Sequence, residues 1–493
     1  MKKLTIKNAL KGVTHESAPS INEDQPIVIS FPNDNIKCNS LVFYTEKDNE
    51  DSIDIFYENE KPYAAVVNRS KLITKSNIPL IKTDSVRESL AHAYSALHKI
   101  DYSKLKIIGV TGTNGKTTTA TLIFEIFKKS GFNVGFIGTG KILINETSLT
   151  DNTYSMTTPD PDLLYHSLSL MQESGCEYVI MEVSSHSLAL KKVAPISFEY
   201  AIFTNLSDEH MDFHKSKDDY YRAKLSLFNQ AKRGLFNMDD GYSRKAYFEA
   251  ECDKTSIGIL YDADVYATDI DIKRLGGSSF YYRGENLMFG IKTRLVGDFN
   301  IYNILCALKC VIDLGIKPCV AKEALETIDG ICGRMEIIKS DITVVIDYAH
   351  TADAFNNCLK NLFYDNNIRQ KSTIVFGCGG NRDKSKREPM GCIASRYTSK
   401  IILTEDNNRD ESFFDITADI AKGIESGCYR VIKDREAAIC AAIEEANEGD
   451  IIAIIGKGHE KYKIENGNRI PFDERMIIEN ALKKRMESHE NQA

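Results

Sequence analysis

The sequence predicts an α/β protein of three domains: a small N-terminal α/β domain, a central P-loop ATPase-like domain on a mostly parallel sheet, and a C-terminal Rossmann-like domain. Short apolar runs alternate with helical segments along two long stretches of the chain, which is typical of parallel sheets covered by helices. The 493 residues suffice for roughly two to four domains. Hydrophobic residues make up 42% and charged residues 27%, the balance of a globular protein with apolar cores.

The first predicted domain spans residues 1–103. Three strand-like runs, PIVISF, NSLVFYT and YAAVVN, are separated there by acidic and Asn-rich loops. A more regular alternation begins at Leu105, so we place a domain boundary just before that residue.

The second predicted domain spans residues 104–335. LKIIGV predicts a short buried strand, the GTNGKT turn follows it, and TTATLIFEIFKKSG predicts a helix that ends at Gly131. Two further strands, EYVIMEV and EYAIFTN, alternate with helices such as PDLLYHSLSLMQESG. This order indicates a mostly parallel sheet.

The third predicted domain spans residues 336–493. ITVVIDYA, STIVFGCGG, KIILTED and GDIIAIIGKG are predicted strands with helical segments between them. Each run ends in polar or Gly-rich residues, which is where open α/β sheets bind their ligands. We therefore expect binding residues directly after these strands.

The composition excludes some classes of partner. Lys and Arg total 62 against 70 Asp and Glu, and the net charge of -8 argues against nucleic acid as the main partner. The N-terminus, MKKLTIKNALKGV, lacks the apolar region of a signal peptide, and no apolar run approaches a membrane span. The 12 cysteines include no C-x-x-C pair, and Cys306 and Cys310 share an apolar helix face, as in core packing. We expect a cytoplasmic protein without a membrane partner.

The stretch VTGTNGKTTTA, residues 110–120, predicts a phosphate-binding loop between a strand and a helix. Two glycines let backbone N–H groups turn inward, and the lysine with the helix start adds positive charge. The threonine after the lysine offers a hydroxyl to Mg²⁺. Val110 stands where an ordinary Walker pattern has glycine, so a glycine-rich turn without a ligand is the alternative. The predicted ATP-binding residues of the loop are Gly112, Thr113, Asn114, Gly115, Lys116, Thr117 and Thr118.

Candidate metal ligands follow the loop. Glu182 ends the strand EYVIMEV, where an acid can bind Mg²⁺, although a surface acid or a helix cap is the alternative. His210 and His214 are four residues apart, a spacing that would suit zinc on a helix, but no third ligand with zinc-like spacing follows. By residue type alone, Lys224 in YYRAK is a solvated helix lysine.

Two later residues are candidates on weaker grounds. Arg334, near a predicted domain junction, could reach a transferring phosphate with its planar guanidinium group. Asp347, at a strand end, could accept hydrogen bonds from ribose hydroxyls. Each motif is weak by itself, because an arginine after a glycine is commonly a surface residue.

The series of motifs from Gly109 to Glu460 resembles that of the Mur ligases. TGTNGKTTT is similar to their ATP loop, and GDFNIYNILCAL, GICGRMEII and VVIDYAHTADAF follow in the family's order. The resemblance implies that Asn303 lies toward adenine, Arg334 toward the phosphates and Asp347 toward ribose. It also implies two Mg²⁺ ions and a Lys224 carbamylated by CO₂, which becomes an oxygen ligand. The implied metal ligands are Thr117, Glu182, His210 and Lys224.

Within the family, the sequence is most similar to E-type members that add meso-diaminopimelate. The resemblance implies that ATP phosphorylates the γ-carboxylate of UDP-MurNAc-L-Ala-D-Glu and that the amine of the diamino acid then attacks the acyl phosphate. The implied catalytic residues are Lys116, Glu182, His210, Lys224 and Arg334. The family's D-N-P-R motif is present as DNNR in TEDNNRDES. The implied amino-acid site comprises Arg382, Asp406, Asn407, Asn408, Arg409, Gly456 and Glu460.

The sequence departs from the family pattern mainly where the UDP-linked substrate binds. The D-S-R triplet of the first domain is absent from VISFPNDN, and Met156 stands where an asparagine is common. Leu190 and Lys192 replace a usual glutamine and arginine. The implied residues of this site are Thr157, Thr158, Ser184 and Lys192. A different carrier, as in pseudomurein or a secondary metabolite, is therefore an alternative.

The residues also leave room for three different activities. A Mur-type ligase could use L-lysine, and a folylpolyglutamate-synthetase-like ligase would share the ATP loop but not the large first domain or the GKGHEKY ending. A nucleotide-gated scaffold would not need the set of His210, Lys224 and Arg334. In the interpretation that the resemblance favours, the partners are small molecules, namely ATP, the UDP-linked dipeptide and a diamino acid, and the protein is a monomer.

Overall fold

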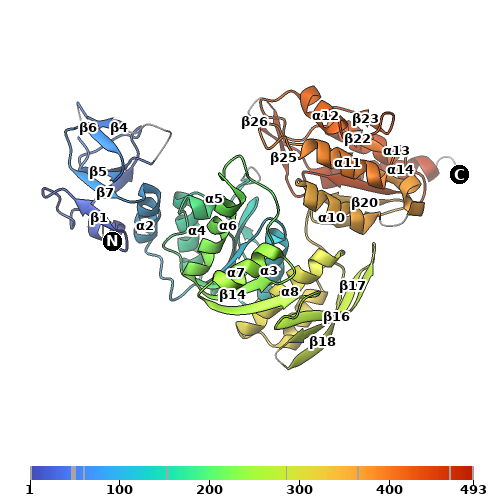
Figure 1. Cartoon of the computed structure of the whole chain (residues 1–493), viewed down its shortest axis with the longest axis horizontal. Coiled ribbons are helices and arrows are strands. Elements are labelled where there is room, and N and C mark those ends of the chain that lie inside the picture. The colour runs from blue at the N-terminus through green and yellow to red at the C-terminus, as the bar shows by residue number, and fades with distance from the viewer. Residues whose placement is uncertain are drawn as a thin grey trace.

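The computed structural model describes residues 3–45, 52–58, 61–151, 154–284, 286–363, 366–465 and 468–490. Three groups of strands and helices follow one another along the chain, and Figure 1 shows the first at the left, the second in the middle and the third at the right. The chain ends lie on opposite sides of the molecule in this view. The predicted α/β class with three parts is confirmed.

The first group contains, within the described ranges, a five-stranded sheet in the order β1-β7-β5-β3-β2. Its pairs are parallel except for β1 with β7. Helix α2 packs against the sheet and begins at Ser85, whose hydroxyl accepts a hydrogen bond from the Glu88 N–H. The elements are α1 (Ile6–Ala9), β1 (His15–Ser17), β2 (Val28–Ser30), β3 (Ser40–Phe43), β4 (Ser52–Ile55), β5 (Ala64–Asn68), β6 (Leu72–Ser76), β7 (Leu80–Thr83) and α2 (Val86–His98).

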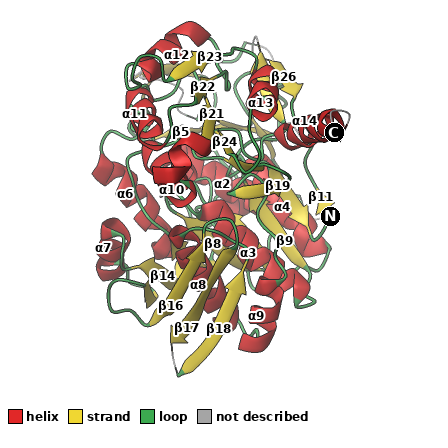
Figure 2. Cartoon of the chain, turned by 90° about the vertical axis from the view of Figure 1, so that its right-hand side faces the viewer, coloured by secondary structure: helices red, strands yellow, loops and turns green. Residues whose placement is uncertain are grey.

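The second group contains, among the described residues, an eleven-stranded sheet in the order β11-β10-β9-β12-β8-β13-β14-β15-β16-β17-β18. Strands β9, β12, β8, β13, β14, β15 and β16 are parallel, as predicted. The antiparallel ribbon β16–β18, which Figure 2 shows beside α8 and α9, was not predicted. The strands are β8 (Lys106–Thr111), β9 (Val134–Gly138), β10 (Lys141–Ile144), β11 (Thr147–Ser148), β12 (Tyr178–Glu182), β13 (Phe198–Phe203), β14 (Ala231–Asn237), β15 (Asp253–Gly258), β16 (Val265–Lys273), β17 (Gly277–Gly284) and β18 (Leu287–Thr293). The helices are α3 (Lys116–Lys129), α4 (Pro161–Glu173), α5 (Ser185–Ala189), α6 (Lys217–Leu225), η1 (Ser226–Gln230), α7 (Gly241–Glu249), α8 (Asp298–Asp313) and α9 (Pro318–Glu326).

The third group contains, in the part of the chain that is described, a six-stranded sheet in the order β19-β20-β24-β21-β22-β23. Only the β19–β20 pair is antiparallel. The elements are β19 (Glu336–Lys339), β20 (Thr343–Asp347), α10 (Ala352–Leu362), η2 (Asn366–Lys371), β21 (Ser372–Phe376), α11 (Arg387–Tyr397), β22 (Ile401–Leu403), α12 (Phe413–Ala421), β23 (Tyr429–Val431), α13 (Arg435–Glu444), β24 (Ile451–Ile455), β25 (Tyr462–Glu465), β26 (Asn468–Pro471) and α14 (Glu474–Glu490).

The sheet order explains why residues from distant motifs meet. Strand β8 pairs with β12 on one side and with β13 on the other, so the segments that leave their carboxyl ends emerge together. These segments carry the glycine loop, Glu182 and residues 204–210. The carboxyl ends of β20, β21, β22 and β24 likewise adjoin in the third sheet.

The cores of the second and third groups are apolar. Helix α8 is part of the core below the central sheet, with Cys306 and Cys310 both buried in it, as predicted from the sequence. Within the described residues, no helix is both long and apolar enough to cross a membrane.

Candidate active site

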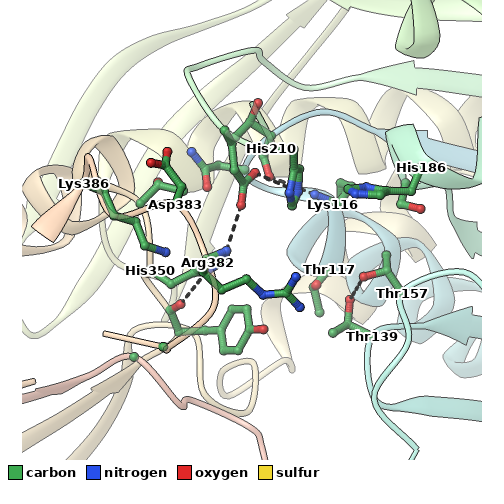
Figure 3. A pocket seen from close by; sticks show the side chains of 18 of the residues that line it. Lys116, Thr117, Thr139, Thr157, His186, His210, His350, Arg382, Asp383 and Lys386 are labelled. Carbon is green, nitrogen blue, oxygen red and sulfur yellow. Dashed lines mark hydrogen bonds and ion pairs between the residues drawn. The ribbon is translucent and has the colours of Figure 1, made fainter. Parts of the chain in front are cut away.

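A cleft of about 1140 Å³ lies between the carboxyl ends of the central and third sheets. In Figure 3, Lys116, Thr117, Thr139 and Thr157 come from the central group, whereas His350, Arg382, Asp383 and Lys386 reach in from the third. The cleft therefore combines residues from both groups in one site.

The glycine loop adopts a conformation that needs its glycines. Gly112 has φ +143°, and a Cβ there would lie 1.9 Å from Thr204 Oγ1. Gly115 has φ +85° and precedes α3 directly. The Lys116 ammonium donates to the carbonyls of Gly112 (2.9 Å) and Thr113 (2.8 Å). The helix start and the lysine thus face the space where phosphates would lie.

The Glu182 carboxylate lies beside the glycine loop and accepts several hydrogen bonds. Its carboxylate is completely buried and accepts from the Thr117 hydroxyl at 2.9 Å. Thr139, at the end of β9, adds its N–H at 3.0 Å and its hydroxyl at 3.1 Å. Arg334 Nη2 lies 3.1 Å from Thr117 Oγ1, which brings the predicted arginine to the loop. Sequence reasoning missed Thr139, because its position becomes significant only once β9 is known to pair with β12.

The donor set of Thr117 and Glu182 suits Mg²⁺. A hydroxyl and a carboxylate side by side are hard oxygen ligands, which Mg²⁺ prefers when phosphate oxygens complete its shell. Among the residues that the structure describes, no three His, Cys, Asp or Glu side chains gather closely enough to hold a metal by themselves. The residues present therefore fit a metal that arrives with a nucleotide rather than a site built only from protein.

His210 and His214 do not form a zinc pair. His210 has φ +60° and lies outside any helix, while His214 Nε2 lies 3.0 Å from Ser185 Oγ. The His210 ring contacts that of His186 instead, with centroids 4.7 Å apart. Burial lowers the pKa of His210 to about 4 against the opposing charge of Glu209, so its imidazole is neutral near pH 7.

A hydrogen bond that was not predicted joins the two sides of the cleft. Glu209 Oε1 lies 2.9 Å from His350 Nε2, and Glu209 Oε2 lies 3.4 Å from His210 Nε2. Burial alone would raise the pKa of Glu209, but His350, His210 and Lys116 together hold it well below its ordinary value. No signal in the sequence marks Glu209 apart from its position beside His210.

Lys224 is buried rather than solvated. Its side chain is 1% exposed, its ammonium donates to the Gly112 carbonyl at 2.8 Å, and it lies 4.4 Å from the Tyr220 ring centre. Burial, aided by the charge of Lys116, lowers its pKa well below the ordinary value although Glu209 opposes this. The interpretation of Lys224 as a surface lysine is wrong, because the face of α6 that carries it packs against the glycine loop.

A second cavity of about 340 Å³ continues from the loop toward α8 and contains Asn303 and Asp347. Asn303 accepts from Thr119 Oγ1 at 3.1 Å and donates to Asn300 Oδ1 at 3.0 Å. The two oxygens of Asp347 each accept a backbone N–H at 2.7 Å, and burial raises its pKa. Its carboxylate is therefore held in place by two hydrogen bonds. Each oxygen keeps a lone pair that can accept a further hydrogen bond.

On the third-sheet side of the cleft, the buried Lys457 lies between the carboxylates of Asp406 and Glu460. Lys457 is 1% exposed, and its ammonium lies 3.2 Å from both Asn407 Oδ1 and Glu460 Oε2 and 3.6 Å from Asp406 Oδ1. Asn407 also donates to Glu460 at 2.9 Å. Burial opposes the ionised form of Asp406, but Lys457 and Arg435 hold its pKa below its ordinary value. Lys457 was missed because it looks like part of an exposed glycine-rich loop.

Two arginines face this acidic group. Arg409 has φ +53°, and its Nη1 donates to the carbonyls of Gly380 (2.8 Å) and Asn407 (3.2 Å). Arg382 lines the cleft and forms no ion pair with any described residue. The pocket therefore presents fixed cations and anions at a short distance from each other.

The threonines on the far side of Glu182 are also held in place. Thr158 Oγ1 donates to the Glu182 carbonyl at 2.9 Å and accepts from the Ser184 N–H at 3.0 Å. Lys192 pairs with Asp160 at 2.6 Å. Most predicted residues therefore line the main cleft, namely Thr113, Asn114, Gly115, Lys116, Thr117, Thr118, Thr157, Thr158, Glu182, Ser184, Lys192, His210, Arg334, Arg382, Asp406, Asn407, Arg409, Gly456 and Glu460. Gly112, Lys224 and Asn408 lie outside its lining.

Comparisons with known proteins identify the family of this chain. The Mur ligase middle domain matches residues 110–311, and the Mur ligase, glutamate ligase domain matches residues 333–458. UDP-N-acetylmuramoyl-L-alanyl-D-glutamate--2,6-diaminopimelate ligase 1 of Clostridium acetobutylicum is 35% identical over 462 residues, covering 92% of this chain and 94% of that protein.

Solved structures are also similar. A UDP-N-acetylmuramoyl-L-alanyl-D-glutamate--2,6-diaminopimelate ligase superposes with a TM-score of 0.64 at 27% identity, covering 98% of this chain and 99% of that one. A pseudomurein peptide ligase type C from Methanothermus fervidus gives a TM-score of 0.58 at 18% identity, covering 85% and 87%, and shares the fold alone.

Proposed function

This chain belongs to the Mur ligase family, and we propose that it joins meso-diaminopimelate to UDP-MurNAc-L-Ala-D-Glu at the expense of ATP, a step of peptidoglycan precursor synthesis. The observation that carries the proposal is one cleft in which Lys116, Thr117 and Glu182 face Arg409 and its acidic neighbours. The relatives named for this reaction cover nearly the whole chain.

Each domain would bind a different substrate. We assign the UDP end of the acceptor to residues 1–103, ATP to residues 104–335 and the diamino acid to residues 336–493. All three substrates are small molecules, and we expect a monomer that works in the cytoplasm, where ATP is available.

The reaction couples two displacements. A γ-carboxylate oxygen of the acceptor bonds to the γ-phosphorus of ATP while the bond to the leaving oxygen breaks, which gives an acyl phosphate and ADP. The diamino-acid nitrogen then bonds to the acyl carbon, loses a proton and expels inorganic phosphate. Lys116, bonded to the carbonyls of the glycine loop, and Arg334, bonded to Thr117, would offset the negative charge that otherwise keeps the carboxylate from the phosphates. Bound Mg²⁺ would add charge neutralisation at the phosphates, held by Thr117 and Glu182.

We propose that Lys224 is carbamylated, and its environment supports this. Burial and the charge of Lys116 lower the pKa of Lys224 well below its ordinary value, so its ammonium gives up a proton more readily. The amine nitrogen that results can bond to the carbon of CO₂ and release a second proton. The product is an anion, so the repulsion from Lys116 becomes attraction. The carbamate oxygens and the neutral imidazole of His210 are the ligands we propose for a second Mg²⁺.

The amino-acid site would select a zwitterionic far end. Arg409, whose Nη1 is occupied by two carbonyls, has Nη2 and Nε for a carboxylate of the substrate. Glu460, Asp406 and Asn407 would accept from the ammonium beside that carboxylate. L-Lysine has the ammonium but not the carboxylate, so it would leave the arginine without a partner.

A second candidate keeps the chemistry but changes the carrier. Lys192, where the family usually has arginine, is paired with Asp160, and the D-S-R triplet is absent. A lysine forms one point contact where an arginine forms a fork, so these replacements favour a carrier with a different anionic group.

A panel assay tests both candidates. The protein would be incubated with ATP, Mg²⁺, UDP-MurNAc-L-Ala-D-Glu and single amino acids, and products would be identified by mass. We expect a product with meso-diaminopimelate and phosphate release only when both acceptor and amino acid are present. No product and no phosphate release with any amino acid would contradict the first candidate. The second candidate would then be supported by phosphate release when the UDP-linked dipeptide is replaced by a peptide on a different anionic carrier.

A further inference from the structure

Another cavity, of about 500 Å³, lies beside the nucleotide cleft and is not used in the proposed reaction. One face of α3 forms its floor, and the turn between β9 and β10 forms one side. The remaining walls are residues from 148–151 and 154–155, the connecting segment 327–332, and residues 459–462 after β24. Its walls therefore come from the central group, the third group and the segment that joins them.

The wall of this cavity contains polar groups without protein partners. Of the nine buried side-chain atoms that lack a hydrogen bond in the described residues, three belong to residues that line it: Thr121 Oγ1, Tyr154 Oη and His459 Nδ1. Native proteins rarely leave such atoms unpaired, because an unmade hydrogen bond costs free energy. The residues that carry these atoms line the cavity, so a polar ligand there could supply a partner, and the Thr121 hydroxyl could reach it by rotation about one side-chain bond.

Three acids that line the cavity pair with basic side chains. Glu125 pairs with Lys128 at 2.9 Å, Asp329 pairs with Arg294, and Glu460 pairs with Lys457 at 3.2 Å. Asp151 has an interaction partner as well. These carboxylates therefore do not repel an anion as strongly as their number suggests.

Two lysines of the cavity have no such counterpart. Lys129, at the end of α3, donates to the Thr327 hydroxyl, and Lys141 lies 4.9 Å from the Phe136 ring centre. Neither forms an ion pair within the described ranges. Lys461 pairs with Asp473 at 3.5 Å. Burial and the charges of Arg334 and Lys141 lower the pKa of His459 to about 3, so its imidazole is neutral. The unbalanced charge of the cavity is positive.

We propose that this cavity is a second ligand site, which binds a small oxyanion of the phosphate or carboxylate class through Lys129, Lys141 and the hydroxyls of Thr121 and Tyr154. Thr117 and Thr139 line both this cavity and the nucleotide cleft, so a bound anion adjoins the phosphate-binding loop. Because the walls come from both groups, occupancy also favours the arrangement in which the third group covers the central one. This site goes beyond the proposed ligation, and binding to it does not depend on that reaction.

The test measures anion binding by titration calorimetry on the full chain with the nucleotide loop filled by a non-hydrolysable ATP analogue and Mg²⁺. Inorganic phosphate and acetate are the probes, and they separate the two sources of oxyanion. Against wild type, we expect Lys129→Gln/Lys141→Gln to lower the affinity for one probe by about tenfold or more. The matched control, Lys273→Gln/Lys292→Gln on the ribbon at the opposite edge of the sheet, should bind as wild type does.

A second variant separates binding from folding. Thr121→Val keeps the shape but removes an unpaired hydroxyl, so the melting temperature should hold or rise while the affinity for the same probe falls. The proposal is supported if the lysine variant loses affinity for phosphate alone or for acetate alone. The probe whose affinity falls then identifies the anion. If neither probe binds in a way that depends on Lys129 and Lys141, the proposal is overturned, whatever the ligation assay gives.

Discussion

The carboxylate of Glu209 and the imidazole of His350 lie 2.9 Å apart and connect the central sheet to the third across the candidate active site. Glu209 is near the carboxyl end of β13 and His350 near that of β20, so the contact depends on how the two groups meet. Glu209 also lies 3.4 Å from His210. The pair therefore links the position of the third group to the histidine proposed as a metal ligand.

We expect Glu209→Gln and His350→Gln each to lower kcat/KM for ligation, because each breaks the same link between the groups. The kcat/KM of the double variant should be no lower than that of the poorer single variant, which corresponds to a coupling free energy of about 0.5–3 kcal/mol between the two positions. Steady-state rates of phosphate release give kcat/KM for each variant. The pair Lys232–Glu199, which does not line the cleft, is the control, since its removal should leave kcat/KM unchanged. Strict additivity of the two active-site variants would refute the link.

Lys116→Ala is expected to lower kcat by about 100-fold or more, because it removes a fixed positive charge at the phosphates. The fold should survive, since the ammonium contacts only carbonyls of its own loop. Ligation rates and circular dichroism measure the two effects. Lys106→Ala, on the strand that leads into the loop, serves as the control. Full activity of Lys116→Ala would show that the loop does not act on phosphates.

Lys224 is expected to carry a carbamate in the presence of bicarbonate. ¹³C NMR with labelled bicarbonate should show a carbamate signal that is absent from Lys224→Met. Bicarbonate should also raise the melting temperature of the wild type only, because burial and Lys116 disfavour the ammonium form of Lys224 and the nearby charge of Lys116 favours an anion in its place.

Lys224→Ala should be nearly inactive and regain part of its activity with a short carboxylic acid, which can occupy the vacated space. A free amine at high bicarbonate, together with normal activity of Lys224→Ala, would rule the carbamate out.

The pH dependence of stability should carry a contribution from His210. Its pKa falls from 6.5 to about 4 on folding, chiefly through burial, so the unfolded chain binds the proton first. This contribution is fully present above about pH 6.5 and is lost as the pH falls through about 4. His210→Gln should therefore flatten the decline of the melting temperature over this window, whereas His166→Gln, an exposed histidine on α4, should not. An unchanged profile in His210→Gln would contradict the assigned pKa.

The sequence predicted the parts of the site that have local signatures. The glycine loop needs φ values that only particular residues tolerate, and the alternation of apolar runs marks β8, α3 and β12. The sequence could not predict contacts between neighbouring strands, because the order of the strands is set by the whole sheet. Thr139 meets Glu182 because β9 lies beside β12, and this pairing leaves no trace in either segment.

The burial of two lysines could not be predicted either, because it results from packing between elements that are distant in the sequence. Lys224 and Lys457 are charged residues in segments that look exposed, yet both are enclosed once the loop and the two strand ends come together. The ribbon β16–β18 was missed because its strands are long and half exposed, and its alternation resembles an ordinary surface segment.

Arg409→Ala tests the residue proposed to choose the amino acid. We expect the preference for meso-diaminopimelate over L-lysine to fall by a few kcal/mol, on the order of the loss when one partner of a buried charge pair is removed. The ratio of kcat/KM for the two amino acids measures it. Arg396→Ala, on the exposed face of α11, is the matched control and should keep the wild-type ratio. An unaltered ratio in Arg409→Ala would assign the discrimination to other residues.

The central claim is most directly tested by a competition. The wild-type protein would receive ATP, Mg²⁺, UDP-MurNAc-L-Ala-D-Glu and equal amounts of meso-diaminopimelate and L-lysine, and the masses of the products would be read early in the reaction. We predict the meso-diaminopimelate adduct almost alone, because only that substrate carries a carboxylate beside its distal ammonium for the proposed contacts with Arg409 and Glu460. Comparable amounts of the lysine adduct, or no UDP-linked adduct at all, would contradict the account.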